Sequence, residues 1–247
     1  ADGLRSGNGG AVYWGGTGTA FTTAFTTSEG VVFSDNSTLG NSDTVKNNSG
    51  NGGAVYFAGT GTITIDSSSN ITFNGNSACN SGGAIAAESG NIAFNGVTIS
   101  NTNTAEYGYG GLAYSKTGRI EAENVAISKQ TAVSGGAVCA LTVSITNSSF
   151  DSNGDTMLNK NGGAVYVLTN GTLTVATSEF SSNKTSGKGG AIYADKANIT
   201  INDSLFTSNT SPSSNGGAVN LNDNCSTTIT DTTFVNNSRS EEHTSEL

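Results

Sequence analysis

Proline is almost absent from this chain, which has a single proline among 247 residues, and charged residues make up only 12%. Long apolar runs are missing as well, so the sequence offers no candidate for a transmembrane helix, and we expect no direct insertion into a membrane. Basic residues are scarce and scattered, and the formal net charge is −9. Because nucleic acids and anionic membrane surfaces bind clustered Lys and Arg, neither is an expected partner.

Cysteine and histidine are also scarce. The three cysteines, Cys79, Cys139 and Cys225, lie far apart and form no CxxC or metal-ligand spacing. Their odd number and wide separation argue against a disulfide framework. The one histidine, His243, stands close to the C-terminus. The sequence therefore predicts no metal site and no cofactor.

Both ends of the sequence interrupt the pattern of the rest. The chain opens inside a repeat, without an initiator Met or a signal peptide. Residues 239–247 break the composition abruptly and match the translation of a common sequencing adapter. We therefore expect residues 1–238 to form one repeat domain that is truncated at both ends, and residues 239–247 to be a non-native tail.

Glycine is abundant, with 34 residues, and it belongs to a repeat. Gly-Gly-Ala followed by Val or Ile alternates with Phe-x-x-Asn along the chain. Four successive copies of the first motif begin at residues 135, 162, 189 and 216, which are 27 residues apart. A fixed period of this size indicates stacked supersecondary units. Eight units are recognisable, with first glycines at 9, 52, 82, 110, 135, 162, 189 and 216.

Each unit contains three short extended segments and no helical periodicity. In the clearest unit they span residues 164–168, 172–176 and 178–180, and apolar residues alternate with Thr in the second segment. Alternation with a period of two is typical of a half-buried strand. Three strands per turn and one turn per repeat predict an all-β fold, a right-handed parallel β-helix of about eight rungs of about 27 residues each.

The repeated side chains have predictable places in such a fold. The glycine pair is expected at a tight corner, and the Asn of the second motif should turn another corner and form a ladder between rungs. Val or Ile should point inward, Phe should be buried and stacked, and the following Tyr should point outward. The inward column is Val12, Val55, Ile85, Val138, Val165, Ile192 and Val219; the phenylalanines are Phe73, Phe150, Phe180, Phe206 and Phe234; the outer tyrosines are Tyr13, Tyr56, Tyr114, Tyr166 and Tyr193.

The sequence supports catalytic and anion-binding interpretations of these motifs less well than the structural interpretation. A phosphate-binding glycine loop needs a following helix and usually a Lys, and neither is present. The strand-end carboxylates Asp66, Asp203 and Asp231 could gather on one face, as carboxylates do in β-helical carbohydrate lyases and hydrolases. The native sequence supplies no His and no local group of Lys or Arg to assist them, so we expect no enzyme activity.

The alternation of the two motifs from about Gly9 to Asn237 resembles the repeat signature of the chlamydia-type polymorphic outer membrane proteins. The resemblance implies an autotransporter passenger domain, which is a β-helix exposed at the bacterial cell surface and outer membrane or secreted. It would act as an adhesin or a structural surface protein, and its partner would be a host-cell or neighbouring-cell surface protein or glycan. Two alternatives stay open: a polysaccharide-active lyase or hydrolase, and an extracellular scaffold without a ligand.

Binding residues are expected where the repeat is least regular, because specific contacts often come from loops on a rigid scaffold. Residues 103–109 depart from the pattern and contain Tyr107 and Tyr109. Exposed aromatic side chains are efficient contact residues, so these two tyrosines are the candidate ligand-binding residues. The first repeat carries Phe21 and Phe25 in a Thr-rich insertion, and we expect these two to cap the open end of the core.

Overall fold

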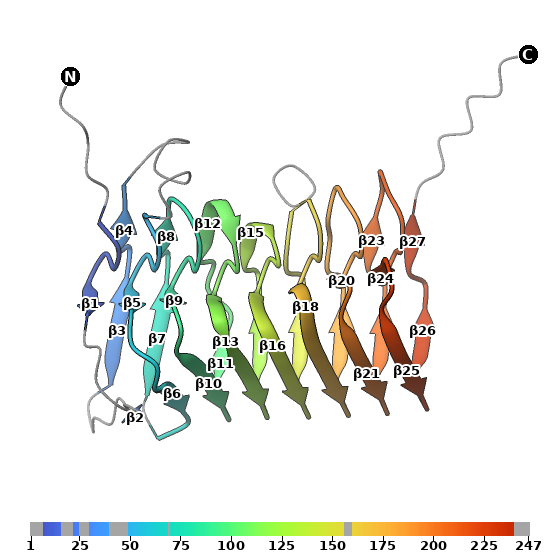
Figure 1. Cartoon of the computed structure of the whole chain (residues 1–247), viewed down its shortest axis with the longest axis horizontal. Helices are drawn as coiled ribbons and strands as arrows, with labels where there is room; N and C mark the ends of the chain where they lie inside the picture. Colours follow the sequence, from blue (N-terminus) through green and yellow to red (C-terminus); the bar gives the residue numbers. More distant parts are fainter. Residues whose placement is uncertain are drawn as a thin grey trace, which may run out of the picture.

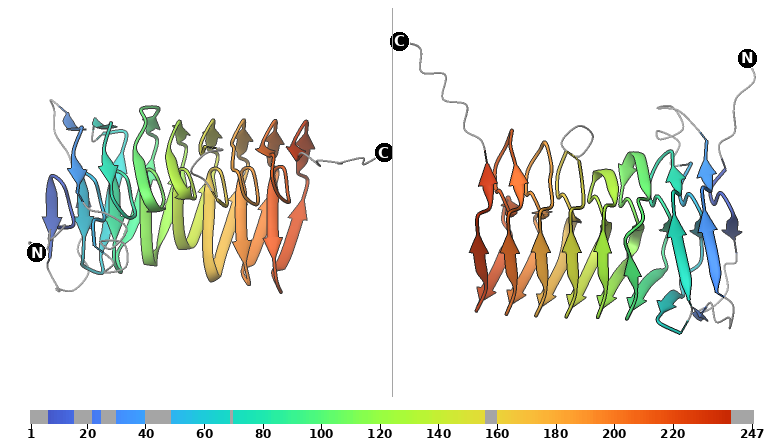
Figure 2. Two further views of the ribbon diagram at one scale, coloured as in Figure 1. Left: turned by 90° about the horizontal axis from the view of Figure 1, so that it is seen from above. Right: turned by 180° about the vertical axis from the view of Figure 1, so that it is seen from behind.

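The computed structural model describes residues 7–15, 22–24, 30–39, 49–68, 70–155 and 160–239, and of residues 22–24 only the backbone. In this part of the chain the regular structure consists of strands, and neighbouring strands pair in parallel. The strands follow one another along a rod in the order of the sequence (Figures 1 and 2). The molecule is therefore a parallel β-solenoid, as the sequence predicted.

The Gly-Gly-Ala motif leads into the first ladder of strands. The eight strands of this ladder are β1 (Val12–Trp14), β5 (Val55–Phe57), β9 (Ile85–Ala87), β13 (Ala113–Glu123), β16 (Val138–Thr146), β18 (Val165–Ala176), β20 (Ile192–Asp195) and β24 (Val219–Asn222). The second ladder consists of β2 (Thr22–Ala24), β6 (Thr62–Asp66), β10 (Asn91–Asn95), the later halves of β13, β16 and β18, β21 (Asn198–Asn202) and β25 (Ser226–Thr230). In β13, β16 and β18 the two expected strands are thus one bent strand with a register shift.

The Phe-x-x-Asn motif forms the third ladder. Its strands are β3 (Val31–Ser34) and β7 (Ile71–Asn74), which pair with each other, and the continuous series β11 (Thr98–Ile99), β14 (Ala126–Ser128), β17 (Ser149–Asp151), β19 (Glu179–Ser181), β22 (Leu205–Thr207) and β26 (Thr233–Val235). Complete turns therefore number about six, fewer than the eight rungs predicted, because this ladder is interrupted between β7 and β11.

A fourth, short ladder follows six of the eight corners of the Asn ladder, and the prediction of three strands per turn missed it. Its strands are β4 (Ser37–Thr38), β8 (Ser77–Ala78), β12 (Thr104–Tyr109) and β15 (Thr131–Ser134) in one sheet and β23 (Thr210–Ser211) and β27 (Ser238–Arg239) in another. These strands are mostly two residues long, which is too short for the alternation of apolar and polar residues to be visible in the sequence.

The inward column occupies the core as expected. Val138, Val165 and Ile192 pair in register and are fully buried, whereas Val12 and Val219 are half-buried because they lie in the first and last strands of the ladder. One unit exchanges its two core residues, since Leu112 replaces the usual Ala and Ala113 takes the inward position. The exchange keeps the volume of the core roughly constant.

The phenylalanine ladder is confirmed for four of its five predicted members. Phe150, Phe180 and Phe206 are fully buried with ring centroids 5.2 and 4.9 Å apart, and Phe73 is buried against Phe33. Phe234 is wrongly predicted as buried: it stacks on Phe206 but stays 45% exposed. It lies in β26, at the end of its ladder, so no described rung covers its outer face. Phe21 and Phe25 lie outside the described residues.

Both corner motifs act as predicted. Gly162 has φ of 65°, and a Cβ added to Gly163 would come within 2.0 Å of the Gly190 carbonyl oxygen, so the stacking of rungs requires glycine at both positions. At the other corner the buried Asn183 donates from Nδ2 to the Phe150 carbonyl and to Asn209 Oδ1, both at 2.9 Å. Equivalent residues continue this ladder along the rod: Asn36, Asn76, Asn103, Gln130, Asn153, Asn183, Asn209 and Asn237. At Gln130 the backbone N–H donates to Asn153 Oδ1, and the side chain donates to the Asn101 and Ser128 carbonyls.

Candidate functional site

The candidate binding residues lie in a strand and not in the loop that their irregular sequence suggested. Tyr107 and Tyr109 belong to β12, which pairs with β8 and β15 and shifts register between Ala105 and Tyr109. The two rings are 52% and 37% exposed. Tyr107 and Tyr109 are two residues apart, so a strand places both side chains on the same face.

The outer tyrosines do point away from the main core, but most of them are buried. Tyr56, Tyr114 and Tyr193 are less than 10% exposed, and Tyr56 and Tyr114 belong to a second cluster with Ala86 and Cys139. Stacking explains the burial, since the rings of Tyr166 and Tyr193 lie 5.2 Å apart. Tyr13 is 60% exposed because it lies in the first strand of this ladder.

Tyr109 fills a gap in this outer ladder of tyrosine rings. Cys139 occupies the position between Tyr114 and Tyr166 in the register. The ring of Tyr109 lies 6.0 Å from that of Tyr114 and 5.4 Å from that of Tyr166, so it bridges the two tyrosines across the smaller cysteine. The repeat pattern alone did not predict this compensation by Tyr109, although a Tyr directly before a glycine pair was its signal in the sequence.

Burial controls the chemistry of this cluster. It raises the pKa of the Tyr114 hydroxyl and the pKa of the fully buried Cys139 thiol. It also raises the pKa of Tyr56, whose hydroxyl donates to Glu88 Oε2 at 3.2 Å while Glu88 pairs with Lys116. A thiol kept protonated and inaccessible is unreactive, so Cys139 serves packing.

The structure brings together two of the three strand-end carboxylates. Asp203 and Asp231 occupy equivalent corner positions with φ of 48° and 47°. Asp66 lies several rungs away and aligns with the residue before that corner, where its Oδ1 accepts bonds from the backbone and hydroxyl of Ser68. Asp66 therefore closes a local turn and belongs to no common site with the other two.

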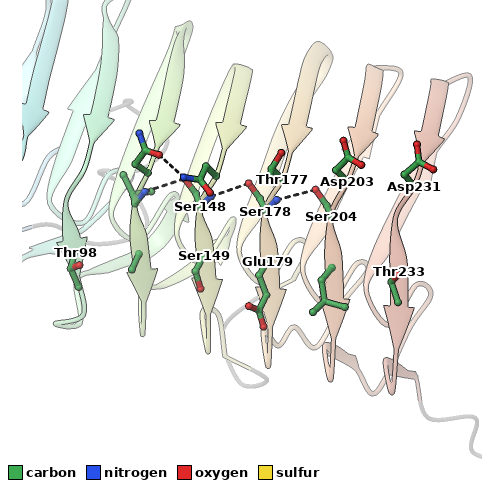
Figure 3. Close-up of a pocket in the computed structure, with 15 residues that line it drawn as sticks. Thr98, Ser148, Ser149, Thr177, Ser178, Glu179, Asp203, Ser204, Asp231 and Thr233 are labelled. Atoms are coloured by element: carbon green, nitrogen blue, oxygen red, sulfur yellow. Dashed lines mark hydrogen bonds between the residues drawn. The ribbon is translucent and has the colours of Figure 1, made fainter.

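A shallow groove of about 860 Å³ runs along this corner of the rod (Figure 3). Its floor contains the serine ladder Ser148, Ser178 and Ser204, in which each backbone N–H donates to the next hydroxyl at 3.1 to 3.2 Å. Its walls carry three exposed carboxylates, Glu179, Asp203 and Asp231, and no cation among the lining residues. The groove is thus polar, acidic and elongated across several rungs.

Two further observations concern the described residues alone. Among them, no three His, Cys, Asp or Glu side chains gather closely enough to hold a metal ion. The same part of the chain contains no helix long and apolar enough to cross a membrane.

The fold and its motifs define a β-solenoid repeat protein, and comparison with known families agrees. Residues 30–58, 70–88 and 177–195 match the Chlamydia polymorphic membrane protein repeat. Each matched segment runs from one Phe-x-x-Asn corner through the following Gly-Gly-Ala strand. The chain therefore carries repeats of this type, as the sequence motifs indicated. Searches of curated proteins and of solved structures gave no match.

Proposed function

We propose that this chain is part of a passenger domain that is exposed at the bacterial surface or secreted, where it acts as an adhesin or a structural surface protein. The matched repeats and the solenoid fit a surface-exposed, autotransporter-like passenger domain. A stiff rod that exposes two tyrosines from one strand supports the adhesive role. The partner would be a protein or glycan on a host cell or a neighbouring cell.

The observation that carries the adhesive role is the support beneath the exposed tyrosines. Tyr109 is held between Tyr114 and Tyr166, so its ring is ordered before any ligand arrives. Tyr107 lies two residues away and exposes 52% of its surface. Pre-ordered aromatic rings lose little conformational entropy on binding, and both protein surfaces and sugar rings pack well on them.

Binding assays with the purified chain test this role. The labelled protein is applied to glycan arrays, to extracellular-matrix proteins and to cultured cells, and its affinity is compared with that of Tyr107→Ala and of Tyr107→Ala/Tyr109→Ala. We expect each variant to lose roughly tenfold or more in affinity, as hot-spot residues do.

Tyr13→Ala is the matched control, because Tyr13 is similarly exposed but lies in the first strand of the outer ladder, several rungs from Tyr109. Its binding should stay unchanged. Equal binding by the wild type and by a folded Tyr107→Ala/Tyr109→Ala variant would show that β12 is not the binding surface. Absence of binding to every surface would favour the ligand-free scaffold.

The acidic groove favours a second candidate, a polysaccharide-active enzyme. Residues in equivalent positions of adjacent rungs lie about 4.8 Å apart, which is close to the separation of paired carboxylates in retaining glycosidases. Incubation with a panel of polysaccharides and an assay for new reducing or unsaturated ends test this activity. Asp203→Asn is a suitable variant, because Asn147 occupies the equivalent corner with φ of 47°. Cleavage that this variant abolishes would establish the enzyme.

A further inference from the structure

Lysine, asparagine and aspartate meet on the outer side of the last two rungs. Lys188 precedes the glycine pair at the corner before β20, Asp195 ends β20, and Asn222 ends β24, which pairs with β20. Lys188 holds the same place in its repeat as Tyr109, directly before the first glycine. The side chain at this place reaches over the outer ladder, and in Lys188 it carries an amine to the following rung.

The three side chains form a continuous chain of contacts. Lys188 Nζ donates to Asn222 Oδ1 at 3.4 Å, and Asn222 Nδ2 donates to Asp195 Oδ1 at 3.1 Å. Thr169 from the preceding rung donates to Asp195 Oδ2 at 3.4 Å. Lys188, Asp195 and Asn222 are all partly buried, and Asp195 lies close enough to the buried Tyr193 to help raise the pKa of its hydroxyl, after the larger effect of burial. An amine, a primary amide and a carboxylate are thus held together by β20, β24 and the corner before β20.

We propose that Lys188 and Asn222 form an intramolecular isopeptide bond, with Asp195 as the residue that moves the proton. The lysine must first lose its extra proton to solvent. Its neutral Nζ then attacks Asn222 Cγ, and a C–N bond forms. Asp195 accepts a proton from the attacking nitrogen and passes it to Nδ2. The bond from Cγ to Nδ2 breaks and ammonia leaves, so the step needs no oxidant and no co-reactant.

Position explains why this pair and not another would react. Lys188 Nζ lies 3.4 Å from Asn222 Oδ1, so the amine is next to the amide group whose carbon it would attack. Reacting groups held next to each other on a rigid scaffold gain a large advantage over free amines and amides. By contrast, Lys116 pairs with the carboxylate of Glu88, which cannot release ammonia. The bond would join residues 34 apart and fasten β24, in the last rung, to the corner before β20. It would thereby hold the last described rung to the rung before it.

Mass spectrometry of the folded chain tests the proposal. Incubation at neutral and mildly alkaline pH should lower the intact mass by one ammonia. Trypsin should then yield a branched peptide in which residues 185–196 are joined to residues 197–239, with Lys188 uncleaved. Fragmentation must place the branch at Asn222 and not at Asn220, which lies two residues before it.

Variants separate this reaction from its alternatives. Succinimide formation at an Asn-Gly site also releases ammonia, but it gives no branched peptide, and the succinimide hydrolyses in alkali to aspartate and isoaspartate. Lys188→Arg keeps the charge and should abolish the branch, and Asp195→Asn should slow its formation roughly 100-fold. A folded wild-type chain in which trypsin still cleaves after Lys188 following prolonged incubation would overturn the proposal, and so would a branch at Asn220.

Discussion

Each buried phenylalanine of the third ladder contacts its counterparts in the rungs before and after it. Phe180 is fully buried, and its ring lies 5.2 Å from that of Phe150 and 4.9 Å from that of Phe206, nearly parallel to both. Removing the Phe180 ring would leave a cavity between the rings of Phe150 and Phe206. The rigid rungs on both sides would keep that cavity from closing. Single residues therefore have large effects on a solenoid even though each rung is small.

Replacing Phe180 by Ala should lower the free energy of unfolding by roughly 3–5 kcal/mol, from the lost burial and the cavity that remains. Chemical denaturation followed by circular dichroism measures the change. Thr174→Ala is the control, because Thr174 lies on the exposed side of the neighbouring ladder, and its effect should stay within about 0.5 kcal/mol. Equal stability of the two variants would show that the Phe stack is not a principal part of the core.

Residues inside a motif were predictable, and those outside it were less so. The burial of Phe150 and the corner role of Asn183 followed from their repetition at a fixed period. Phe57 and Phe94 are also fully buried, but neither belongs to a motif. For Phe94 the signal was present, since it aligns with Ile65 in an alternating segment. Phe57 fits only because Gly90 in the next rung leaves room for its ring.

The bounds of the strands were harder to predict from the sequence than the burial of single residues. Asn170 and Gly171 indicated a break between two strands, yet β18 continues through them, with Asn170 at φ of 64°. The chain bends there without losing its place in the ladder, because the register shifts between Ala140 and Thr142 of the adjacent strand. Turn residues thus indicate a change in the direction of the chain, and whether the strand ends there depends on its pairing with the neighbouring strand.

The place of Tyr109 in the outer ladder depends on the small residue at position 139, and this dependence predicts an energetic coupling between the two side chains. Cys139→Tyr restores the tyrosine found at this position in neighbouring rungs, but Tyr109 already fills the space. Overpacking should make the single variant less stable by about 1–3 kcal/mol. Adding Tyr109→Ala should recover most of that loss, because the new ring can then stack between Tyr114 and Tyr166.

A double-mutant cycle on unfolding free energies measures this coupling. Strictly additive effects of Cys139→Tyr and Tyr109→Ala would mean that the two side chains do not compete for one place. Tyr107→Ala combined with Cys139→Tyr is the control pair, since Tyr107 belongs to the same strand and lies exposed at its surface. That pair should show additive effects.

At the scale of the whole molecule, the outer tyrosine ladder makes stability depend on alkaline pH. Burial, as the largest cause, raises the pKa of Tyr56, Tyr114 and Tyr166 in the folded chain. A tyrosine in the unfolded chain titrates near pH 10. Below that pH these hydroxyls are protonated in both states, and the stability of the ladder is fully present. Above it the unfolded chain releases protons that the folded chain keeps, so stability falls as pH rises from about 10 toward the raised pKa values.

The rod should therefore unfold in alkali in a cooperative step in which its buried tyrosines ionise together. Tyrosinate absorbance and circular dichroism, recorded on the same samples across the alkaline range, test this expectation. The late part of the absorbance change should coincide with the loss of the β-sheet signal. Tyr114→Phe removes one of the groups that ionise on unfolding, so its stability should fall less steeply with pH than that of the wild type. If all seven tyrosines ionised near pH 10 while the β-sheet signal persisted, the outer ladder would be open to solvent and its burial would not stabilise the rod.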